Sequence, residues 1–341
     1  MIRIGVLCPA EIALRRFMPA LKKMDGFEFV GVATYSFEER YGLNAERTQE
    51  RQSRLERSRE KAQEFIDLYG GTLYESYQAI CTDETIDALY IPVPPAAHFM
   101  WTKLALESGK HVFLEKPSTT SLSDTKALAE LAKAKNLALH ENYMFVFHKQ
   151  LNEINRIIEE GTIGEVRLYR LAFGFPRRAA GDFRYQKAAG GGAIYDCGGY
   201  TLKYADYLLK GKGRIAYASS VLDKETDVEI LGTAAMVDDA GVTVQMAFGM
   251  DNEYKCELEV WGSKGTLKHE RIFTAPAGFV PCCSIKKGAE QETIELPEDD
   301  TFFKSLKYFG KCIADMEERK TSYRNILRQA ELVEETIKFS K

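Results

Sequence analysis

The sequence predicts a doubly wound, parallel α/β domain followed by a second α+β domain with a large, mostly antiparallel open sheet. Over the first 140 residues, apolar runs alternate with amphipathic helical patterns, as expected when helices cover both faces of a parallel sheet. After residue 141, strand-like runs are separated by turn residues, which is typical of antiparallel sheets. The 341-residue length suits two domains, which we place at 1–122 and 123–341.

The order of elements follows from the same patterns. In the first domain we expect strands at 2–7, 27–33, 87–93, 111–116 and 137–140, with helices at 11–24, 96–108 and 123–135. In the second we expect strands at 165–173, 213–221, 227–237, 242–249, 255–262, 265–273 and 292–296, with helices at 149–160, 202–209, 300–318 and 322–339. The two C-terminal helices are placed in the second domain, with packing back on the first domain as an alternative.

Composition excludes several classes of function. The net charge of −4 gives no general attraction to nucleic acid or to an anionic membrane. No apolar run reaches the ~20 residues of a membrane helix, and we expect no signal peptide. The seven cysteines are dispersed without a C-x-x-C pair, which predicts reduced thiols, a cytoplasmic location and no metal site.

The opening segment "IGVLCPAEIALRRFMPAL", residues 4–21, has the strand–turn–helix pattern that holds a dinucleotide pyrophosphate. Its turn lacks the usual glycines, and Pro9 offers no N–H. The helix start still provides amides and a partial positive charge. We therefore expect cofactor contacts from Cys8, Pro9, Ala10, Glu11 and Ile12, with a purely structural strand–helix as the alternative.

The end of the second strand bears on the choice of cofactor. NAD-binding enzymes usually place a carboxylate there, but Thr34, Tyr35 and Ser36 include none. Thr34, Ser36 and Arg40 are candidate ligands of a 2′-phosphate, with Tyr35 against the adenine, so NADP(H) is favoured and NAD(H) is the alternative. The six arginines of the exposed insertion at 38–61 either form solvated i,i+4 pairs or lie beside the adenosine end.

Two further motifs carry candidate chemistry. In "IPVPPAAHFMWTKLALESGKHVFLEKP", residues 91–117, Lys116 follows a strand at the carboxyl edge of the sheet, where it can stabilise charge on a substrate oxygen. In "GGGAIYDCGGYTLKYADYLL", residues 190–209, Asp196 and Tyr200 are four apart and share a helix face. A phenol such as that of Tyr200 can exchange a proton with a carbonyl that accepts a hydride.

These motifs resemble those of the glucose–fructose oxidoreductase, inositol dehydrogenase and rhizopine catabolism (Gfo/Idh/MocA) family. The resemblance covers essentially the whole chain, including "ENYMFVFH", "EEGTIGEVRLYRLAF" and "GDFRYQKAAGGGAIYDCGGY". It implies a Rossmann domain and a second domain whose sheet commonly forms a homo-oligomer, a dimer or tetramer. Tyr200 stands where polyol dehydrogenases have His, and "PAEIALRRFMPAL" resembles nucleotide-sugar 3-ketoreductases.

The resemblance also implies roles for individual residues. Lys116, Asp196 and Tyr200 match its catalytic positions, and the cofactor's nicotinamide side is expected to meet Pro92, Pro94, His98, Glu115 and Lys116. His148 and Arg184, with Asp196 and Tyr200, are expected to bind a small sugar-type substrate. For His98 and His148 a capping or core role is an equal alternative, and for Arg184 an exposed salt bridge is the alternative.

Three functions follow from these observations. The first is an NAD(P)-dependent oxidoreductase acting on a sugar or a sugar nucleotide, with Tyr200 as proton donor and Lys116 polarising the oxygen. The second is a dihydrodiol- or glucose–fructose-type oxidoreductase acting on a free small molecule. The third is a non-catalytic dinucleotide-binding sensor.

Overall fold

The computed structural model describes residues 1–179 and 181–340. It divides the chain into two compact units, one of Met1–Asn142 with Ser305–Leu327, and one of Tyr143–Lys304 with the chain from Arg328. The first unit extends past the predicted boundary at residue 122, because the strand at 139–141 pairs with the strand at 111–114 and completes the unit's sheet.

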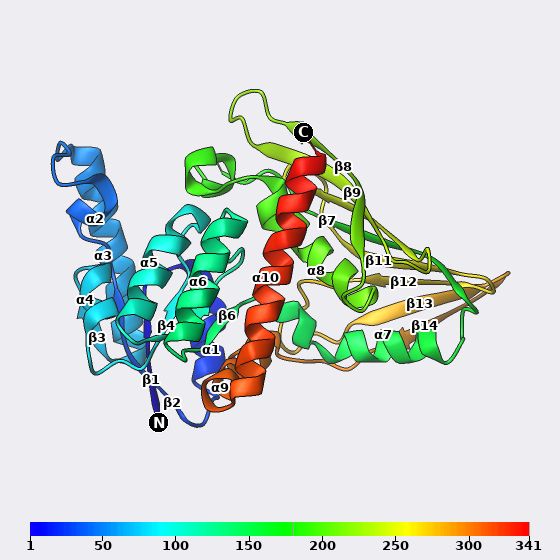
Figure 1. Ribbon diagram of the computed structural model, residues 1–341, viewed down its shortest axis with the longest axis horizontal. Coiled ribbons are helices and arrows are strands. Elements are labelled where there is room, and N and C mark those ends of the chain that lie inside the picture. Colours follow the sequence, from blue (N-terminus) through cyan, green and yellow to red (C-terminus); the bar gives the residue numbers. More distant parts are fainter. Residues whose placement is uncertain (180, 341) are drawn as a thin grey trace. The chain divides into compact units, whose positions relative to one another are not determined.

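The first unit contains a parallel sheet of six strands within the described residues, in the order β3-β2-β1-β4-β5-β6 (Figure 1). The strands are β1 (Ile2–Val6), β2 (Phe27–Ala33), β3 (Thr72–Tyr74), β4 (Ala88–Ile91), β5 (His111–Leu114) and β6 (Leu139–Glu141). Every residue of β4 is buried, as continuous apolar strands covered on both faces require. The predicted doubly wound sheet is confirmed.

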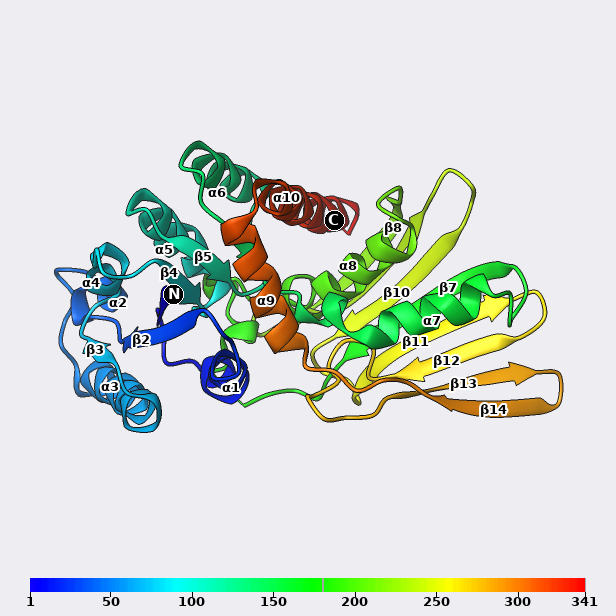
Figure 2. The ribbon, with the colours of Figure 1, turned by 90° about the horizontal axis from the view of Figure 1, so that it is seen from below.

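Helices cover both faces of this sheet. They are α1 (Met18–Leu21), α2 (Phe37–Tyr41), α3 (Gln49–Tyr69), α4 (Tyr77–Thr82), α5 (Pro95–Glu107), α6 (Leu122–Ala134), α9 (Thr301–Ala314) and the first part of α10 (Met316–Phe339). In Figure 2, α1 and α3 lie on one side of the sheet and α5 and α6 on the other. The predicted helix at 11–24 is interrupted by a π-helical turn, η1 (Ala13–Phe17).

The charged stretch at 38–61 forms α2 and most of α3. Ser36 begins α2 with a capping box, in which its hydroxyl accepts from the amide of Glu39 and the Glu39 carboxylate accepts from the Ser36 amide. Helix α3 begins at the cap residue Thr48 and ends at Gly70, which has a φ of 74° that favours glycine. The insertion expected at 38–61 is therefore largely helical, and its second helix continues to Tyr69.

The second unit contains a mixed sheet of eight strands within the described residues, in the order β14-β13-β12-β11-β7-β10-β9-β8. The strands are β7 (Val166–Gly174), β8 (Arg214–Leu222), β9 (Glu229–Val237), β10 (Thr243–Gly249), β11 (Lys255–Gly262), β12 (Thr266–Glu270), β13 (Cys282–Lys287) and β14 (Glu290–Glu295). Strands β7 and β10 pair in parallel and the other neighbours pair antiparallel, which confirms the predicted open sheet. Strand β13 was not predicted, because its short run "CCSIKK" ends in two lysines.

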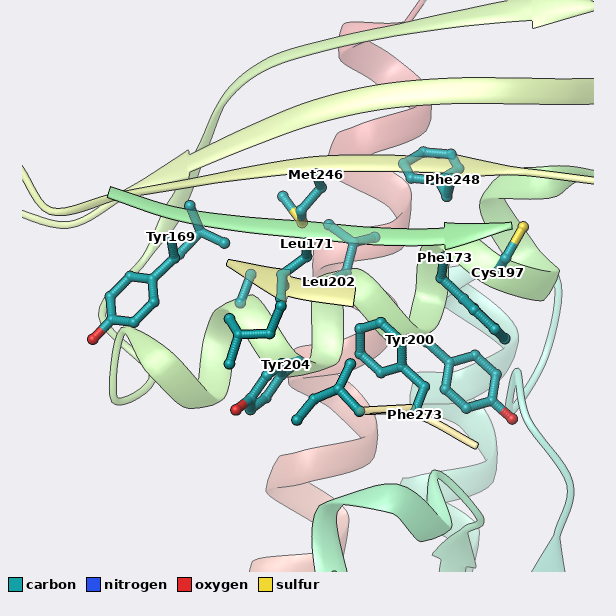
Figure 3. Packing of buried hydrophobic residues seen from close by; sticks show 14 of the residues in the cluster. Tyr169, Leu171, Phe173, Cys197, Tyr200, Leu202, Tyr204, Met246, Phe248 and Phe273 are labelled. Carbon is teal, nitrogen blue, oxygen red and sulfur yellow. The ribbon is translucent and has the colours of Figure 1, made fainter. Parts of the chain in front are cut away.

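One face of this sheet is covered by α7 (Lys149–Glu159) and α8 (Gly199–Leu208), which lie over it in Figures 1 and 2. Alternate residues of β10 and β11 point into the core beneath them. Figure 3 shows how aromatic side chains from β7, α8 and the segment after β12 meet in that core. The core therefore holds the first turn of α8, which carries Tyr200.

Candidate active site

The turn after β1 keeps a helix start that suits an anion, although the glycines are missing. The amide of Ala10 donates to the Cys8 carbonyl at 2.7 Å. The amides of Glu11 and Ile12 lie in the first helical turn, where no carbonyl of the same helix accepts from them. These amides and the helix dipole fit a dinucleotide pyrophosphate, whereas Pro9 contributes no donor.

The pKa of the Cys8 thiol in this turn is affected by nearby charges. Burial raises the pKa of its thiol, while a hydrogen bond with Tyr77 and the positive charges of Arg40 and Lys61 act to lower that pKa. Arg40 therefore lies close enough to the turn to act on it electrostatically.

The predicted ligands of the 2′-phosphate each have a partner inside the first unit. The Thr34 hydroxyl donates to the Ser58 hydroxyl oxygen at 2.7 Å, and the Ser36 hydroxyl caps α2. The guanidinium of Arg40 lies over the ring of Tyr35, 5.6 Å from its centre. These contacts hold the end of β2 against α2 and α3.

A cavity of about 280 Å³ lies beyond the end of β2. Its walls come from the segment after β2, from α3 and from the residue after β3: Thr34, Tyr35, Ser36, Phe37, Glu38, Arg47, Gln52, Leu55, Glu56, Arg59 and Glu75. The sequence did not single out Arg47 or Arg59, and the only signal for them was the arginine-rich composition of 38–61. Arg40 is not among the lining residues.

Lys116 follows β5 at the carboxyl edge of the parallel sheet, and its peptide bond to Pro117 is cis. The neighbouring Glu115 carboxylate accepts from the Tyr90 hydroxyl at 2.7 Å and from the Asn142 side-chain amide at 2.8 Å. Burial raises the pKa of Glu115, against these two donors, which lower it. Glu115 is thus bonded to neighbouring strands, and it fixes the backbone from which Lys116 extends.

His98 is fully buried in the first turn of α5. Its Nδ1 lies 2.7 Å from the Pro117 carbonyl oxygen, and its Nε2 lies 2.8 Å from the Val93 carbonyl oxygen. Burial lowers the pKa of His98 to about 4, although the two carbonyls favour the protonated ring. The ring joins the turn after β4, which contains Pro92 and Pro94, to the turn after β5, so it acts as a brace between them.

Asp196 and Arg184 meet in the second unit. Asp196 lies in the π-helical turn η5 (Ile194–Gly198) that precedes α8, and it is 9% exposed. The Arg184 Nε donates to its Oδ2 at 2.6 Å, and Nη1 of the same guanidinium lies 3.2 Å from Asp182. Burial acts to lower the pKa of Arg184, but the two carboxylates outweigh it and raise that pKa. Arg184 therefore forms a largely buried salt bridge, and not the exposed one considered as an alternative.

Tyr200 stands in the first turn of α8 and is 8% exposed. The centre of its ring lies 5.0 Å from that of Phe173, 5.3 Å from Tyr143 and 5.6 Å from Phe145. Its hydroxyl, directed away from the aliphatic part of the cluster (Figure 3), has the sulfur of Met144 at 4.0 Å. The ring is thus a packing residue, while the hydroxyl lies at the edge of that packing.

His148 occupies the cap position of α7. Its Nδ1 accepts from the Gln150 amide at 3.1 Å, and burial lowers the pKa of the ring. Gln150 in turn contacts Nε2 of His269 through its side-chain oxygen at 3.0 Å. In the second unit His148 therefore belongs to a buried polar cluster at the start of α7.

A doubly wound parallel sheet whose first strand leads into a helix start is typical of dinucleotide-binding proteins, many of which are oxidoreductases. Similarity to known proteins identifies the family. Residues 26–143 match the oxidoreductase family with an NAD-binding Rossmann fold, and residues 151–268 match the GFO/IDH/MocA C-terminal domain. The chain belongs to the Gfo/Idh/MocA family of oxidoreductases, as its motifs predicted.

Individual relatives are similar over nearly the whole chain. The dTDP-3,4-didehydro-2,6-dideoxy-α-D-glucose 3-reductase of Actinomadura kijaniata is 34% identical over 335 residues, covering 98% of this chain and 94% of its own. The protein of the same name from Streptomyces violaceoruber is also 34% identical, with the same coverage. A solved 3-ketoreductase from Actinomadura kijaniata, in complex with NADP and TDP-benzene, has a TM-score of 0.89 at 33% identity and covers 99% of this chain and 97% of its own. The predicted likeness to sugar 3-ketoreductases is confirmed.

No helix within 1–179 and 181–340 is long and apolar enough to cross a membrane. In the same residues, no group of three or more His, Cys, Asp or Glu side chains is arranged to hold a metal ion.

Proposed function

We propose that this oxidoreductase uses NADP(H) to reduce a keto group on a nucleotide-linked sugar. The observation that carries the proposal is the full-length similarity to dTDP-sugar 3-reductases, in a chain that keeps Lys116, Asp196 and Tyr200 at the motif positions. The choice of NADP(H) is supported by the similar 3-ketoreductase, which was solved with NADP.

The residues of the first unit fit such a cofactor. The amides of Glu11 and Ile12 are suited to its pyrophosphate, and the cavity beyond β2 is suited to its adenosine end. When bound, the reduced nicotinamide supplies the hydride. The protein's own part is to hold the substrate, polarise its oxygen and provide the proton.

Tyr200 is proposed to give its hydroxyl proton to the oxygen that is reduced, and Lys116 to hydrogen-bond that oxygen and stabilise the charge that develops on it. Solved forms of the Actinomadura kijaniata 3-ketoreductase include a variant with one tyrosine changed to phenylalanine and variants with one lysine changed. In that protein the altered lysine and tyrosine are separated by as many residues as Lys116 and Tyr200 are here. This equal spacing supports the two assignments.

Asp196 is proposed to orient a substrate hydroxyl. Its Oδ2 accepts from Arg184, so the carboxylate is held in one direction at the start of the helix that carries Tyr200. Arg184 is then a positioning residue, because its guanidinium is already engaged by Asp196 and Asp182.

The test has two stages. Titration of the protein with NADPH and NADH, followed by nicotinamide fluorescence, measures cofactor binding. NADPH consumption is then measured with a nucleotide-linked 3-keto sugar and with free aldoses and ketoses, and NADPH formation from NADP+ is measured with a dihydrodiol. Turnover of the nucleotide-linked sugar alone supports the proposal. Turnover of only the free compounds would contradict the substrate assignment, and binding without any turnover would indicate a sensor.

We further propose that the open sheet of the second unit forms a homo-oligomer. Its strands expose large apolar side chains, among them Tyr217, Val221 and Trp261. Trp261 is 43% exposed and lies on β11, so Trp261→Glu should lower the mass measured by light scattering if this face is the interface. An unchanged mass in both proteins, equal to one chain, would refute the proposal.

A further inference from the structure

The cavity beyond β2 is built by the inserted helix α3. Gln52, Leu55, Glu56 and Arg59 line it at intervals of three and four residues, so they form one face of the helix. The wall is fixed to the end of β2 at two points. The Thr34 hydroxyl donates to Ser58 at 2.7 Å, and the Tyr35 hydroxyl donates to the Arg54 carbonyl at 3.1 Å.

Two arginines that line the cavity form ion pairs with glutamates. Nη2 of Arg47 lies 2.6 Å from the Glu38 carboxylate, and Nη2 of Arg59 lies 2.7 Å from the Glu75 carboxylate. The guanidinium of Arg47 also stacks over the ring of Phe37, 4.3 Å from its centre. The stacking keeps this cation at the cavity even when its carboxylate partner moves away.

These ion pairs are exposed, with 43–64% of each side chain accessible to solvent. Exposed pairs contribute little stability, because water and salt compensate their charges well. A phosphate dianion also accepts charge-assisted hydrogen bonds from a guanidinium, and it carries more negative charge than a carboxylate. The weak pairing with Glu38 and Glu75 therefore leaves Arg47 and Arg59 available to a phosphate.

We propose that this cavity sets the preference between NADP(H) and NAD(H) through two opposed pairs of residues. Arg47 and Arg59 bind the ribose 2′-phosphate, while Glu38 and Glu75 compete for the arginines and accept from the 2′-hydroxyl of NAD(H). The inference rests on the dinucleotide binding of the proposed function. It differs from the prediction for Arg40, which stacks on Tyr35 and acts on Cys8 at the β1 turn.

The proposal predicts the sign of the change in NADPH and NADH affinity for each variant of the cavity. Removing an arginine removes a phosphate ligand but leaves the 2′-hydroxyl of NAD(H) its acceptors. Removing the glutamate charges does the reverse, because it leaves the arginines available to the phosphate and takes away the acceptors. Opposite shifts in the NADPH and NADH dissociation constants are therefore the result expected from these opposed pairs.

The experiment measures dissociation constants for NADPH and NADH by fluorescence in the full-length protein. Arg47→Ala and Arg59→Ala are each expected to weaken NADPH binding about tenfold, the loss of one charge-assisted bond, and to leave NADH within twofold. The double variant Glu38→Gln/Glu75→Gln is expected to tighten NADPH about threefold or more and to weaken NADH. Arg57→Ala, on the same helix but outside the cavity lining, is the matched control and should change neither constant.

The outcomes separate the two proposals. If the wild-type protein binds neither cofactor, the proposed function itself fails. If it binds them and the arginine variants leave the NADPH constant unchanged, or weaken NADPH and NADH equally, the cavity does not set the preference and the inference is overturned. The inference is also overturned if the glutamine double variant does not improve NADPH binding. Circular dichroism of each variant checks that α3 is intact.

Discussion

Nε of Arg184 lies 2.6 Å from Oδ2 of Asp196, within the second unit. The arginine comes from the short helix η3 (Phe183–Tyr185), and the aspartate from the π-helical turn that leads into α8. π-helical turns are often found at functional sites. The ion pair therefore ties the loop before the glycine run to the start of the helix that carries Tyr200.

Loss of this arginine should destabilise the protein. Arg184→Met leaves the Asp196 carboxylate, only 9% exposed, without this cation, and breaking such a buried pair costs about 3 kcal/mol. Urea unfolding measures the change in the free energy of unfolding. Arg184→Lys keeps the charge but not the geometry and should lose less, so equal stability of all three proteins would contradict a structural role for the pair.

Asp196→Asn tests the function of the same carboxylate, because it keeps the size of the side chain and removes its charge. If Asp196 orients a substrate hydroxyl, this variant should raise KM and lower kcat for the sugar substrate while NADPH binding stays the same. A variant with wild-type values for both constants would show that the aspartate serves only the fold.

Lys116→Met should remove most of the turnover without unfolding the protein. One preorganised donor to a developing oxyanion is worth about 10²–10³ in rate. The backbone around Lys116 is held by the bonds from Tyr90 and Asn142 to Glu115, which the substitution leaves in place. Steady-state kinetics and an NADPH titration on the same preparation check this, and undiminished turnover would remove Lys116 from the mechanism.

Tyr200→Phe should lower kcat by about 10²–10⁴, the range for a positioned proton donor. Stability should change by less than about 1 kcal/mol, because the substitution keeps the ring and its contacts with Phe173 and Tyr143. In contrast, Tyr200→Ala removes a packed aromatic ring and should cost about 3–5 kcal/mol. Thermal unfolding separates the two effects.

Tyr200→His extends this test to the pH profile. An imidazole in this position should restore part of the activity lost in Tyr200→Phe, with a pH dependence shifted toward ~6.5. A Tyr200→Phe protein with near wild-type turnover would instead redirect the search for the proton donor to other side chains.

We expect His111 to contribute to a decrease in the free energy of unfolding as the pH is lowered. Its Nδ1 accepts from the Ala138 amide at 2.9 Å, and burial, followed by the charge of Arg319, lowers its pKa to about 4. Between pH ~6.5, the ordinary value, and pH ~4, the unfolded chain binds a proton that the folded chain does not. The free energy of unfolding should then fall as pH is lowered through this window, by up to about 3 kcal/mol.

His111→Asn should flatten this dependence, because the asparagine oxygen can accept from the same amide without titrating. Urea unfolding at pH 7, 6, 5 and 4.5 gives both curves. Parallel curves for the wild type and the variant would show that other groups carry the acid sensitivity.

The sequence by itself determined the parallel sheet and the position of Lys116 on it. Continuous apolar runs such as those of β4 and β5 are local signals, and a residue that follows a strand of a parallel sheet lies at the sheet's carboxyl edge. The motif around Asp196 and Tyr200 was also readable locally. These features depend on neighbours in the chain, so periodicity and motif reveal them.

Only the tertiary structure decided which side chains meet. Of the six arginines of 38–61, two line the cavity at the end of β2: Arg47, in the segment before α3, and Arg59, on α3 itself. The pairing of Arg184 with Asp196 and the parallel pairing of β7 with β10 likewise join residues that are distant in sequence. Such contacts depend on strand order, helix rotation and burial, and no local pattern encodes them.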